Sequence, residues 1–234
     1  MLSTMRDHKG HVLIKDWYTD VVPFTAAERE AVAKIPNDGQ QLAASLGLAQ
    51  VEGNGETQVE LLNHPSLNIN GLLSADVAAQ ARNIIPTTAT AALDLRLVLG
   101  NDWQRQIDKL VKHLQAQGYF ITDHDPTAEE RLQHALIAKV THGTGYNAQR
   151  TPMSLPFSQE LIKAVQAGTT KPLVVLPGTG GSLPLKIIED KMGVHIVIVP
   201  IANYDDNQHA ENENLRLQNL WDGICEYMVI MERL

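Results

Sequence analysis

Residues 203–223 read Asn203-Tyr-Asp-Asp-Asn-Gln-His-Ala-Glu-Asn-Glu-Asn-Leu-Arg-Leu-Gln-Asn-Leu-Trp-Asp-Gly223, a polar stretch between two apolar segments. Before it, residues 195–200 form a run rich in Ile and Val, which is typical of a strand buried on both faces. After it, large apolar side chains recur at roughly helical spacing as far as Met231. The polar stretch is therefore predicted to be a loop that leads from a strand into a C-terminal helix.

His209 is the candidate metal ligand in this loop. Carboxylate and amide side chains surround it in the sequence, and ligands of open α/β sheets bind beyond the carboxyl ends of the strands. The alternative is a histidine that is hydrogen-bonded within a polar loop, and a single histidine without partners does not decide between the two.

Composition indicates a globular chain. It has 234 residues, of which 44% are hydrophobic, enough for one large or two small domains. The formal net charge is −8 and the Lys and Arg residues are not clustered. Because nucleic acids and anionic membranes bind concentrated positive charge, we expect neither as a partner.

Cysteine usage and apolar runs predict the compartment. Cys225 is the only cysteine, which excludes an internal disulfide framework and fits a reducing compartment, and we expect it in the core. The N-terminus has no apolar stretch of the signal-peptide kind, and no segment approaches the ~20 apolar residues of a membrane helix. These features predict a soluble, cytoplasmic protein.

The first part of the chain predicts a small α+β domain. Thr25 followed by Glu28 is a capping box before a helix that reaches about Ala33. An amphipathic helix is expected from Trp103, ended by Gly118. Further elements are expected as a short helix over 40–48 and strands over 12–15, 67–73, 89–97 and 119–122. This order suits a sheet layered on helices.

The polar segment 123–131 contains Pro126 and almost no apolar residues, so we predict domains over 1–122 and 123–234. In the second domain strands and helices alternate, which implies parallel strands with helices on their faces. The expected elements are strands over 135–140, 173–176 and 195–199 and helices over 157–167 and 185–192. They supply too few strands for a complete doubly wound domain.

Two further features suit the binding of an anion. The turn Gly178-Thr-Gly-Gly-Ser-Leu-Pro184 precedes a predicted helix, so its N–H groups can bind an anion, although tight-turn geometry alone also explains the glycines. Arg96 lies on a strand otherwise filled with Ala and Leu, and its planar guanidinium suits a carboxylate. The alternative is an ordinary exposed arginine.

Three stretches together resemble the di-zinc metallopeptidase family that includes carnosinases, aminoacylase, carboxypeptidase G and succinyl-diaminopimelate desuccinylase, and its dipeptidase branch in particular. They are Pro200–Asn214, with His209 before Asn212-Glu213; Asn83-Ile-Ile-Pro86, followed ten residues later by Arg96; and the Gly181-Ser182 turn. The resemblance covers essentially the whole chain. It implies an α/β fold with an α+β lid (dimerisation) domain of sheet plus helices over 1–122, its N-terminal part missing. An incomplete three-layer α/β zinc-peptidase catalytic domain would follow over 123–234.

The resemblance also implies roles for single residues. His209 would be one ligand of a site for two zinc ions, in which cobalt or manganese can replace zinc. Gly181 and Ser182 would bind the free carboxylate of the substrate, and Arg96 would contact the substrate. Asn83 would reach the active site of the partner in a homodimer formed through the lid. Arg150 and the loop 143–146 resemble a loop of the dipeptidase branch, without an assigned role, and no catalytic residue is assigned.

The family takes most of its metal ligands and its general-base Glu from an N-terminal half. This chain contains no His-x-Asp, and its only adjacent pair of glutamates is Glu129-Glu130. That pair lies near Asp123-His124-Asp125, a cluster with metal-ligand residue types that we interpret as a solvated linker instead of a second metal site.

We therefore expect the C-terminal portion of a zinc-dependent metallopeptidase that hydrolyses dipeptides or N-acyl amino acids. This chain alone is expected to be inactive and not to hold zinc stably. The alternative is a non-enzymatic dimerisation or binding module, or a subunit that pairs with a separate N-terminal half. The second domain is expected to show an apolar face that must be covered by oligomerisation or refolding.

Overall fold

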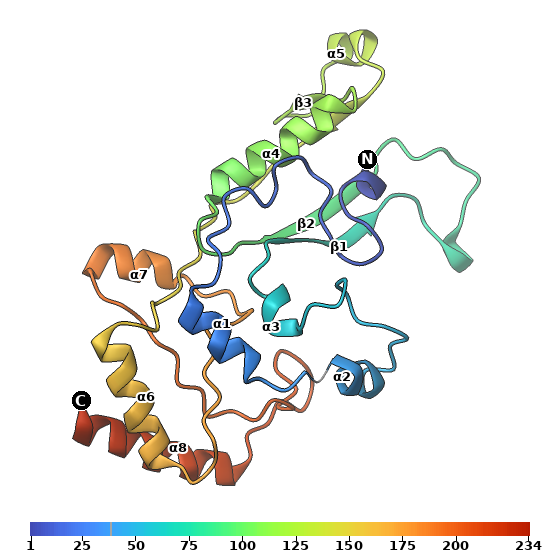
Figure 1. Ribbon diagram of the computed structural model, residues 1–234. Helices are drawn as coiled ribbons and strands as arrows, with labels where there is room; N and C mark the ends of the chain where they lie inside the picture. The colour runs from blue at the N-terminus through green and yellow to red at the C-terminus, as the bar shows by residue number, and fades with distance from the viewer. Residues whose placement is uncertain (38) are drawn as a thin grey trace. The chain divides into compact units, whose positions relative to one another are not determined.

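The computed structural model describes residues 1–37 and 39–234, and the chain forms two compact units (Figure 1). Unit 1 comprises Met1–Pro23, Asn37–Gln149 and Gly180–Lys186, and unit 2 comprises Phe24–Pro36, Arg150–Thr179 and Ile187–Leu234. The mixed α/β class predicted from the sequence is confirmed, with small sheets and helices. The predicted domain boundary after residue 122 divides the sequence, whereas these units are defined by contacts in space, so the boundary stays a prediction.

Unit 1 is built on an antiparallel pair of strands, β1 (Ser66–Leu73) and β2 (Thr90–Arg96). Ser66 lies opposite Arg96 at one end of the pair, and the register shifts between Ile69 and Gly71. The predicted helix beside them is α4 (Trp103–Ala116). Asp102 caps it by accepting a hydrogen bond from the N–H of Arg105 at 3.0 Å, and Gly118 follows it with φ +89°, which glycine adopts without strain.

A second pair of strands in unit 1 is parallel. Strand β3 (Phe120–Thr122) pairs with β4 (Ile137–Lys139), and the short helix α5 (Ala128–Gln133) connects them. The strand expected over 135–140 therefore pairs with the strand expected over 119–122. The remaining short elements of unit 1 are η1 (Leu2–Thr4), α2 (Gly39–Ser45), α3 (Gln58–Leu61) and η2 (Ala78–Gln80).

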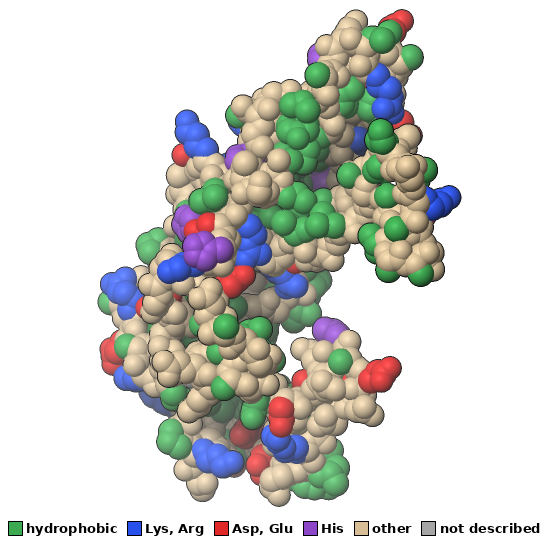
Figure 2. All heavy atoms as spheres, turned by 90° about the vertical axis from the view of Figure 1, so that its right-hand side faces the viewer, with side chains coloured by type: hydrophobic (Ala, Val, Ile, Leu, Met, Phe, Trp, Pro, Cys, Tyr) green, Lys and Arg blue, Asp and Glu red, His purple; other side chains and the backbone are tan. Residues whose placement is uncertain are grey.

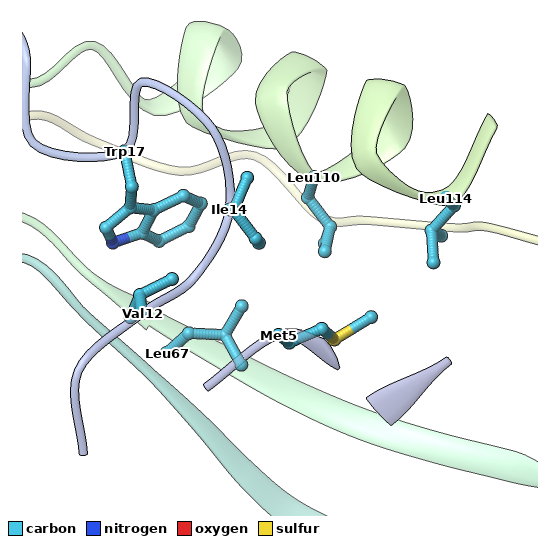
Figure 3. Close-up of a cluster of buried hydrophobic side chains, with 7 residues drawn as sticks. All are labelled: Met5, Val12, Ile14, Trp17, Leu67, Leu110 and Leu114. Carbon is cyan, nitrogen blue, oxygen red and sulfur yellow. The ribbon is translucent and has the colours of Figure 1, made fainter. Parts of the chain in front are cut away.

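The core of unit 1 lies between α4 and the strands. Figure 3 shows Leu110 and Leu114 pointing from the helix toward Leu67 of β1, with the N-terminal segment filling the space around them. Trp17 from that segment is 1% exposed, and its indole N–H donates to the carbonyl of Pro65 at 3.1 Å. Each large apolar side chain buried in this way contributes ~1.5–3 kcal/mol. The full cluster is Met5, Val12, Ile14, Trp17, Leu67, Leu110 and Leu114.

Unit 2 consists mainly of helices. The predicted capping box is confirmed at α1 (Ala26–Ala33), where Thr25 accepts from the N–H of Glu28 and Glu28 accepts from the N–H of Thr25. Helix α6 (Pro156–Gly168) packs against α8 (Leu217–Arg233). Helix α7 (Leu185–Met192) has the bounds that its sequence pattern predicted, and it begins in the last segment of unit 1.

One face of α8 remains exposed. Large apolar side chains recur along it every three or four residues, and we call them the α8 stripe: Leu217, Trp221, Ile224, Met228 and Met231. The opposite face contains the buried Gly223, where a Cβ would lie 2.5 Å from the side chain of Ile201. A helix that is apolar on two faces is typical of one that packs between two neighbours.

Three of the predicted strands are wrong, because these segments do not pair into a sheet. In the described part of the chain, residues 173–176 and 195–199 belong to no ladder, and Val12 makes only an isolated bridge with Arg6. A strand requires a hydrogen-bonded neighbour, whereas an apolar run in the sequence indicates burial and says nothing of pairing. Cys225, expected in the core, is exposed on α8.

The surface agrees with the composition. On the face drawn in Figure 2, Lys and Arg side chains are dispersed among Asp and Glu, with exposed hydrophobic side chains between them. No helix among residues 1–37 and 39–234 is both long enough and apolar enough to cross a membrane.

Candidate functional site

The β1–β2 pair has an apolar face and a polar face. Successive residues of a strand point to opposite faces, so Leu93 and Leu95 pack against the core of unit 1 while Asp94 and Arg96 lie on the other face. Arg96 is the last residue of β2. The strand therefore presents a guanidinium at its carboxyl end, away from the core.

The side chain of Arg96 makes three hydrogen bonds with described residues, all within unit 1. Its Nε–H donates to Oδ2 of Asp94 at 3.0 Å, and its Nη1 donates to the carbonyl of Gly180 at 3.2 Å and to Oγ of Ser182 at 2.5 Å. The structure thus brings together Arg96 and Ser182, two of the predicted substrate-binding residues, which lie far apart in the sequence.

This arrangement leaves donors free for an anion. Because Oγ of Ser182 accepts from Arg96, the hydroxyl hydrogen of Ser182 can donate elsewhere. Neither N–H of Arg96 Nη2 makes a hydrogen bond within the part of the chain that the structure describes, and the side chain is 46% exposed. A carboxylate has two oxygens that accept such donors, so the chemistry of the site fits a carboxylate.

The glycine-rich turn is exposed beside Arg96. Gly181 lies between the two residues that Arg96 contacts, and its predicted part in carboxylate binding stays a prediction. Gly180 packs against Leu62, where a Cβ would lie 2.7 Å from the end of the Leu62 side chain. Leucine can move, so this glycine is favoured but not strictly required by packing.

His209 lies in unit 2, in a loop held by Asn203. The buried Asn203 accepts from the N–H of Arg216 at 2.9 Å and donates to Oδ1 of Asp205 at 3.0 Å. The hydrogen bond from Asn203, with the charge of Arg216, lowers the pKa of the Asp205 carboxyl below its ordinary value. The side chain of Asn203 therefore connects the beginning of the predicted loop to its end at Arg216.

The backbone of this loop has unusual dihedral angles. His209 has φ +64°, and Asn207 and Asn212 have φ +61° and +62°. Residues other than glycine adopt this region rarely, and such backbone positions cluster at functional sites. His209 is exposed, and its N–H donates to Oε2 of Glu213 at 3.4 Å.

A complete zinc centre does not fit the described residues. Across residues 1–37 and 39–234, no group of three or more His, Cys, Asp or Glu side chains is arranged to hold a metal ion. His209 can supply one ligand, whereas protein zinc sites use at least three.

The polar cluster that the sequence places in a linker is a hydrogen-bonded network at α5. The ring of His124 contacts Asp123 at 3.0 Å, Glu130 at 3.2 Å and the hydroxyl of Thr122 at 2.8 Å. Asp123 and Glu130 raise the pKa of His124 above its ordinary value of 6.5. Glu130 also accepts from the N–H of Thr127 and so caps the helix.

Asn83 and Arg150 differ in what surrounds them. Asn83 is exposed in the segment between β1 and β2, and its predicted role across a dimer stays a prediction. Arg150 is 7% exposed and forms an ion pair with Glu28, which is 3% exposed, at 3.2 Å. Its guanidinium also lies 5.2 Å from the ring centre of Phe24. Sequence reasoning missed this pair, because nothing near either residue indicates so distant a partner.

The chain is of the α/β class, and its strand arginine, in contact with a Gly-Ser turn, has free donors that suit a carboxylate. Comparison with known protein families identifies the family of the chain. The M20 peptidase dimerisation domain matches residues 3–120, half of the chain, and the chain belongs to that family.

Curated relatives extend the likeness over nearly the whole chain. The Cys-Gly metallodipeptidase DUG1 of Candida albicans is 26% identical over 230 residues, which are 95% of this chain and 44% of the relative. The Beta-Ala-His dipeptidase of Homo sapiens is 21% identical over 235 residues, 95% of this chain and 42% of the relative. The chain thus spans less than half the length of these relatives.

Solved structures agree with the fold. The M20 family metallo-carboxypeptidase Sso-CP2 from Sulfolobus solfataricus superposes with a TM-score of 0.78 at 25% identity, over 99% of this chain and 50% of that one. The dipeptidase Dug1p of Saccharomyces cerevisiae gives 0.73 at 20% identity, over 99% and 47%.

Proposed function

We propose that this chain supplies the dimerisation part and the substrate-carboxylate-binding part of a zinc-dependent metallopeptidase that hydrolyses dipeptides or N-acyl amino acids. The observation that carries the proposal is the contact of Arg96 with Ser182. The names of the relatives support the substrate class, because Cys-Gly and Beta-Ala-His are both small peptides that end in a free carboxylate.

In this proposal the carboxylate of the substrate accepts from Nη2 of Arg96 and from the hydroxyl of Ser182, and the backbone N–H of Gly181 adds a third donor. Asn83 acts on the active site of the partner in a homodimer formed through the lid. These residues bind and orient the substrate. They transfer no proton and break no bond, so no catalytic residue is proposed in this chain.

His209 is proposed as one ligand of a two-zinc site, in which cobalt or manganese can replace zinc. Because the described residues assemble no group of three ligands, we expect this chain alone neither to retain zinc nor to hydrolyse peptides. A reducing, cytoplasmic location is proposed from the single cysteine.

The test combines binding with turnover on the purified chain. N-Acetylglycine should bind, and Arg96→Ala should abolish binding while the fold is retained. Cys-Gly, β-Ala-His and N-acetyl amino acids should not be hydrolysed when zinc, cobalt or manganese is added and bound metal is counted. Turnover that a chelator stops and His209→Ala removes would contradict the proposal, because other residues would then complete the metal site.

A second candidate is a dimerisation or binding module, or a subunit that pairs with a separate polypeptide. The exposed α8 stripe and the apolar residues 173–176 and 195–199, which belong to no strand ladder in the described part of the chain, favour it, since exposed apolar surface marks interfaces. Light scattering distinguishes the cases. A dimer of twice the 25.7 kDa chain mass that binds no N-acetylglycine would favour the module.

A further inference from the structure

We infer that Asp94 is a positioning residue that orients Arg96 toward the carboxylate of the substrate. The inference rests on the proposed function of the Arg96–Ser182 site and adds a residue to it. Asp94 itself does not touch the substrate: it acts through the guanidinium.

The strand geometry puts the two side chains together. Asp94 and Arg96 are two residues apart on β2 and therefore on the same face, with Asn68 and Ser66 opposite them on β1. Oδ2 of Asp94 accepts from Nε–H of Arg96 at 3.0 Å. The side chain of an arginine at the end of a strand can rotate about several bonds, and the hydrogen bond from Nε–H to Asp94 restricts these rotations.

The guanidinium is held on two sides. Asp94 holds Nε, whereas the carbonyl of Gly180 and Oγ of Ser182 hold Nη1. A guanidinium has five N–H donors, and among the described residues these three hydrogen bonds leave the two donors of Nη2 free. Because the group is planar, fixing Nε and Nη1 also fixes the direction in which Nη2 points. By orienting Arg96, Asp94 thus points the N–H donors of Nη2 in the direction in which they can bind a carboxylate together with the hydroxyl of Ser182.

Asp94 has two effects of opposite sign on anion binding. Its hydrogen bond orders Arg96, which lowers the entropy lost when a carboxylate binds. Its negative charge opposes a bound carboxylate, although solvent screens this repulsion at a site where Asp94 is 36% exposed. The direction of the change on removing Asp94 therefore separates a positioning role from an electrostatic one.

The experiment is a titration of the full chain with N-acetylglycine, followed by NMR of ¹⁵N-labelled arginine side chains. In the native chain, Nε–H of Arg96, assigned by its loss in Arg96→Lys, should give a sharp signal that shifts on titration. Asp94→Asn should broaden this signal and weaken binding by roughly fivefold, because the neutral amide oxygen of asparagine accepts from Nε–H more weakly than a charged carboxylate does. Asp94→Glu should recover part of both.

The control is Asp76→Asn. Asp76 pairs with Arg82 at 2.7 Å, also in an exposed ion pair of unit 1, so its loss should leave N-acetylglycine binding unchanged. Exposed ion pairs contribute little to stability, so both variants should fold, as checked by circular dichroism.

Two results would overturn the inference in distinguishable ways. If Asp94→Asn binds N-acetylglycine as tightly as the native chain or more tightly, Asp94 does not position Arg96 and the proposed function stands. If the native chain does not bind N-acetylglycine at all, the proposed carboxylate site fails, and the role of Asp94 fails with it.

Discussion

The two units differ in how completely they bury their large apolar side chains. Trp17 in unit 1 is 1% exposed and closes a core around α4, whereas Trp221 in unit 2 is 57% exposed on the α8 stripe. Unit 1 also holds the Arg96–Ser182 contact, and unit 2 holds His209. The residues proposed to bind the substrate carboxylate therefore lie on the unit with the buried core around α4, whereas the candidate metal ligand lies on the unit that exposes the α8 stripe.

The largest expected effect compares the two tryptophans directly. Trp17→Ala should lower the free energy of unfolding by about 3–5 kcal/mol, because it leaves a cavity and an unpaired carbonyl at Pro65. Trp221→Ala should change it by no more than about 0.5 kcal/mol, as expected for an exposed side chain. Urea unfolding followed by circular dichroism measures both. Similar losses for the two variants would break the contrast between the units.

The second prediction tests the part of unit 2 that is buried. Arg150→Met should lower the free energy of unfolding by about 3 kcal/mol, because it leaves the carboxylate of Glu28 buried without its cation. Lys34→Met is the matched control, since Lys34 and Glu30 form an exposed pair at 2.8 Å worth about 0.5 kcal/mol or less. If both variants lose the same small amount, the Arg150–Glu28 pair does not hold α1 in unit 2.

Local signals predicted the helices well. The Thr25–Glu28 capping box, the start of α4 at Trp103 and the bounds of α7 all follow from residues within a few positions of each other. The expected strands over 173–176 and 195–199 fail, because pairing depends on a distant neighbour that no local pattern specifies.

In the candidate site, too, some features could be predicted from the sequence and others depend on partners distant in the chain. Arg96 and Ser182 were identified through resemblance, and the structure places them in contact. A spacing of two residues on a strand predicts that Asp94 shares a face with Arg96, but this pattern alone assigns Asp94 no role. Arg150 and Glu28 could not have been paired from the sequence, since each has only local signals and the partner comes from a remote segment.

The third prediction concerns the α8 stripe. The double change Trp221→Gln and Met228→Gln should roughly halve the fluorescence of a bound hydrophobic dye and leave stability within about 0.5 kcal/mol, because the side chains are exposed. Leu132→Gln, which removes one exposed leucine on α5 in unit 1, serves as the control and should leave dye binding unchanged. Unchanged dye binding in the double variant would show that the stripe is covered in solution.

The smallest expected effect is a pH dependence at α5. The contacts with Asp123 and Glu130 raise the pKa of His124 in the folded chain above 6.5. These contacts therefore stabilise the fold fully below pH 6.5, and this stabilisation is lost as the pH rises through the raised pKa of the folded chain. The pKa of Glu130 is lowered, chiefly by the hydrogen bond from the N–H of Thr127. The stability that the ionised Glu130 adds to the folded chain is therefore lost as the pH falls through this lowered pKa. NMR titration of the His124 ring should give a pKa above 6.5, and Asp123→Asn should lower it. A value at or below 6.5 in the native chain would contradict these contacts.

The contrast between the units is tested most directly by amide hydrogen exchange on the native chain. Amides of α4 around Leu110–Leu114 should exchange at least about a hundredfold more slowly than those of residues 174–176 and 196–199, since helical amides under a closed core open rarely and amides outside any ladder are not protected. That result would support a closed unit 1 and an open unit 2. Equal protection of the three segments would mean that unit 2 is closed as well, and would contradict the proposed difference between the two units.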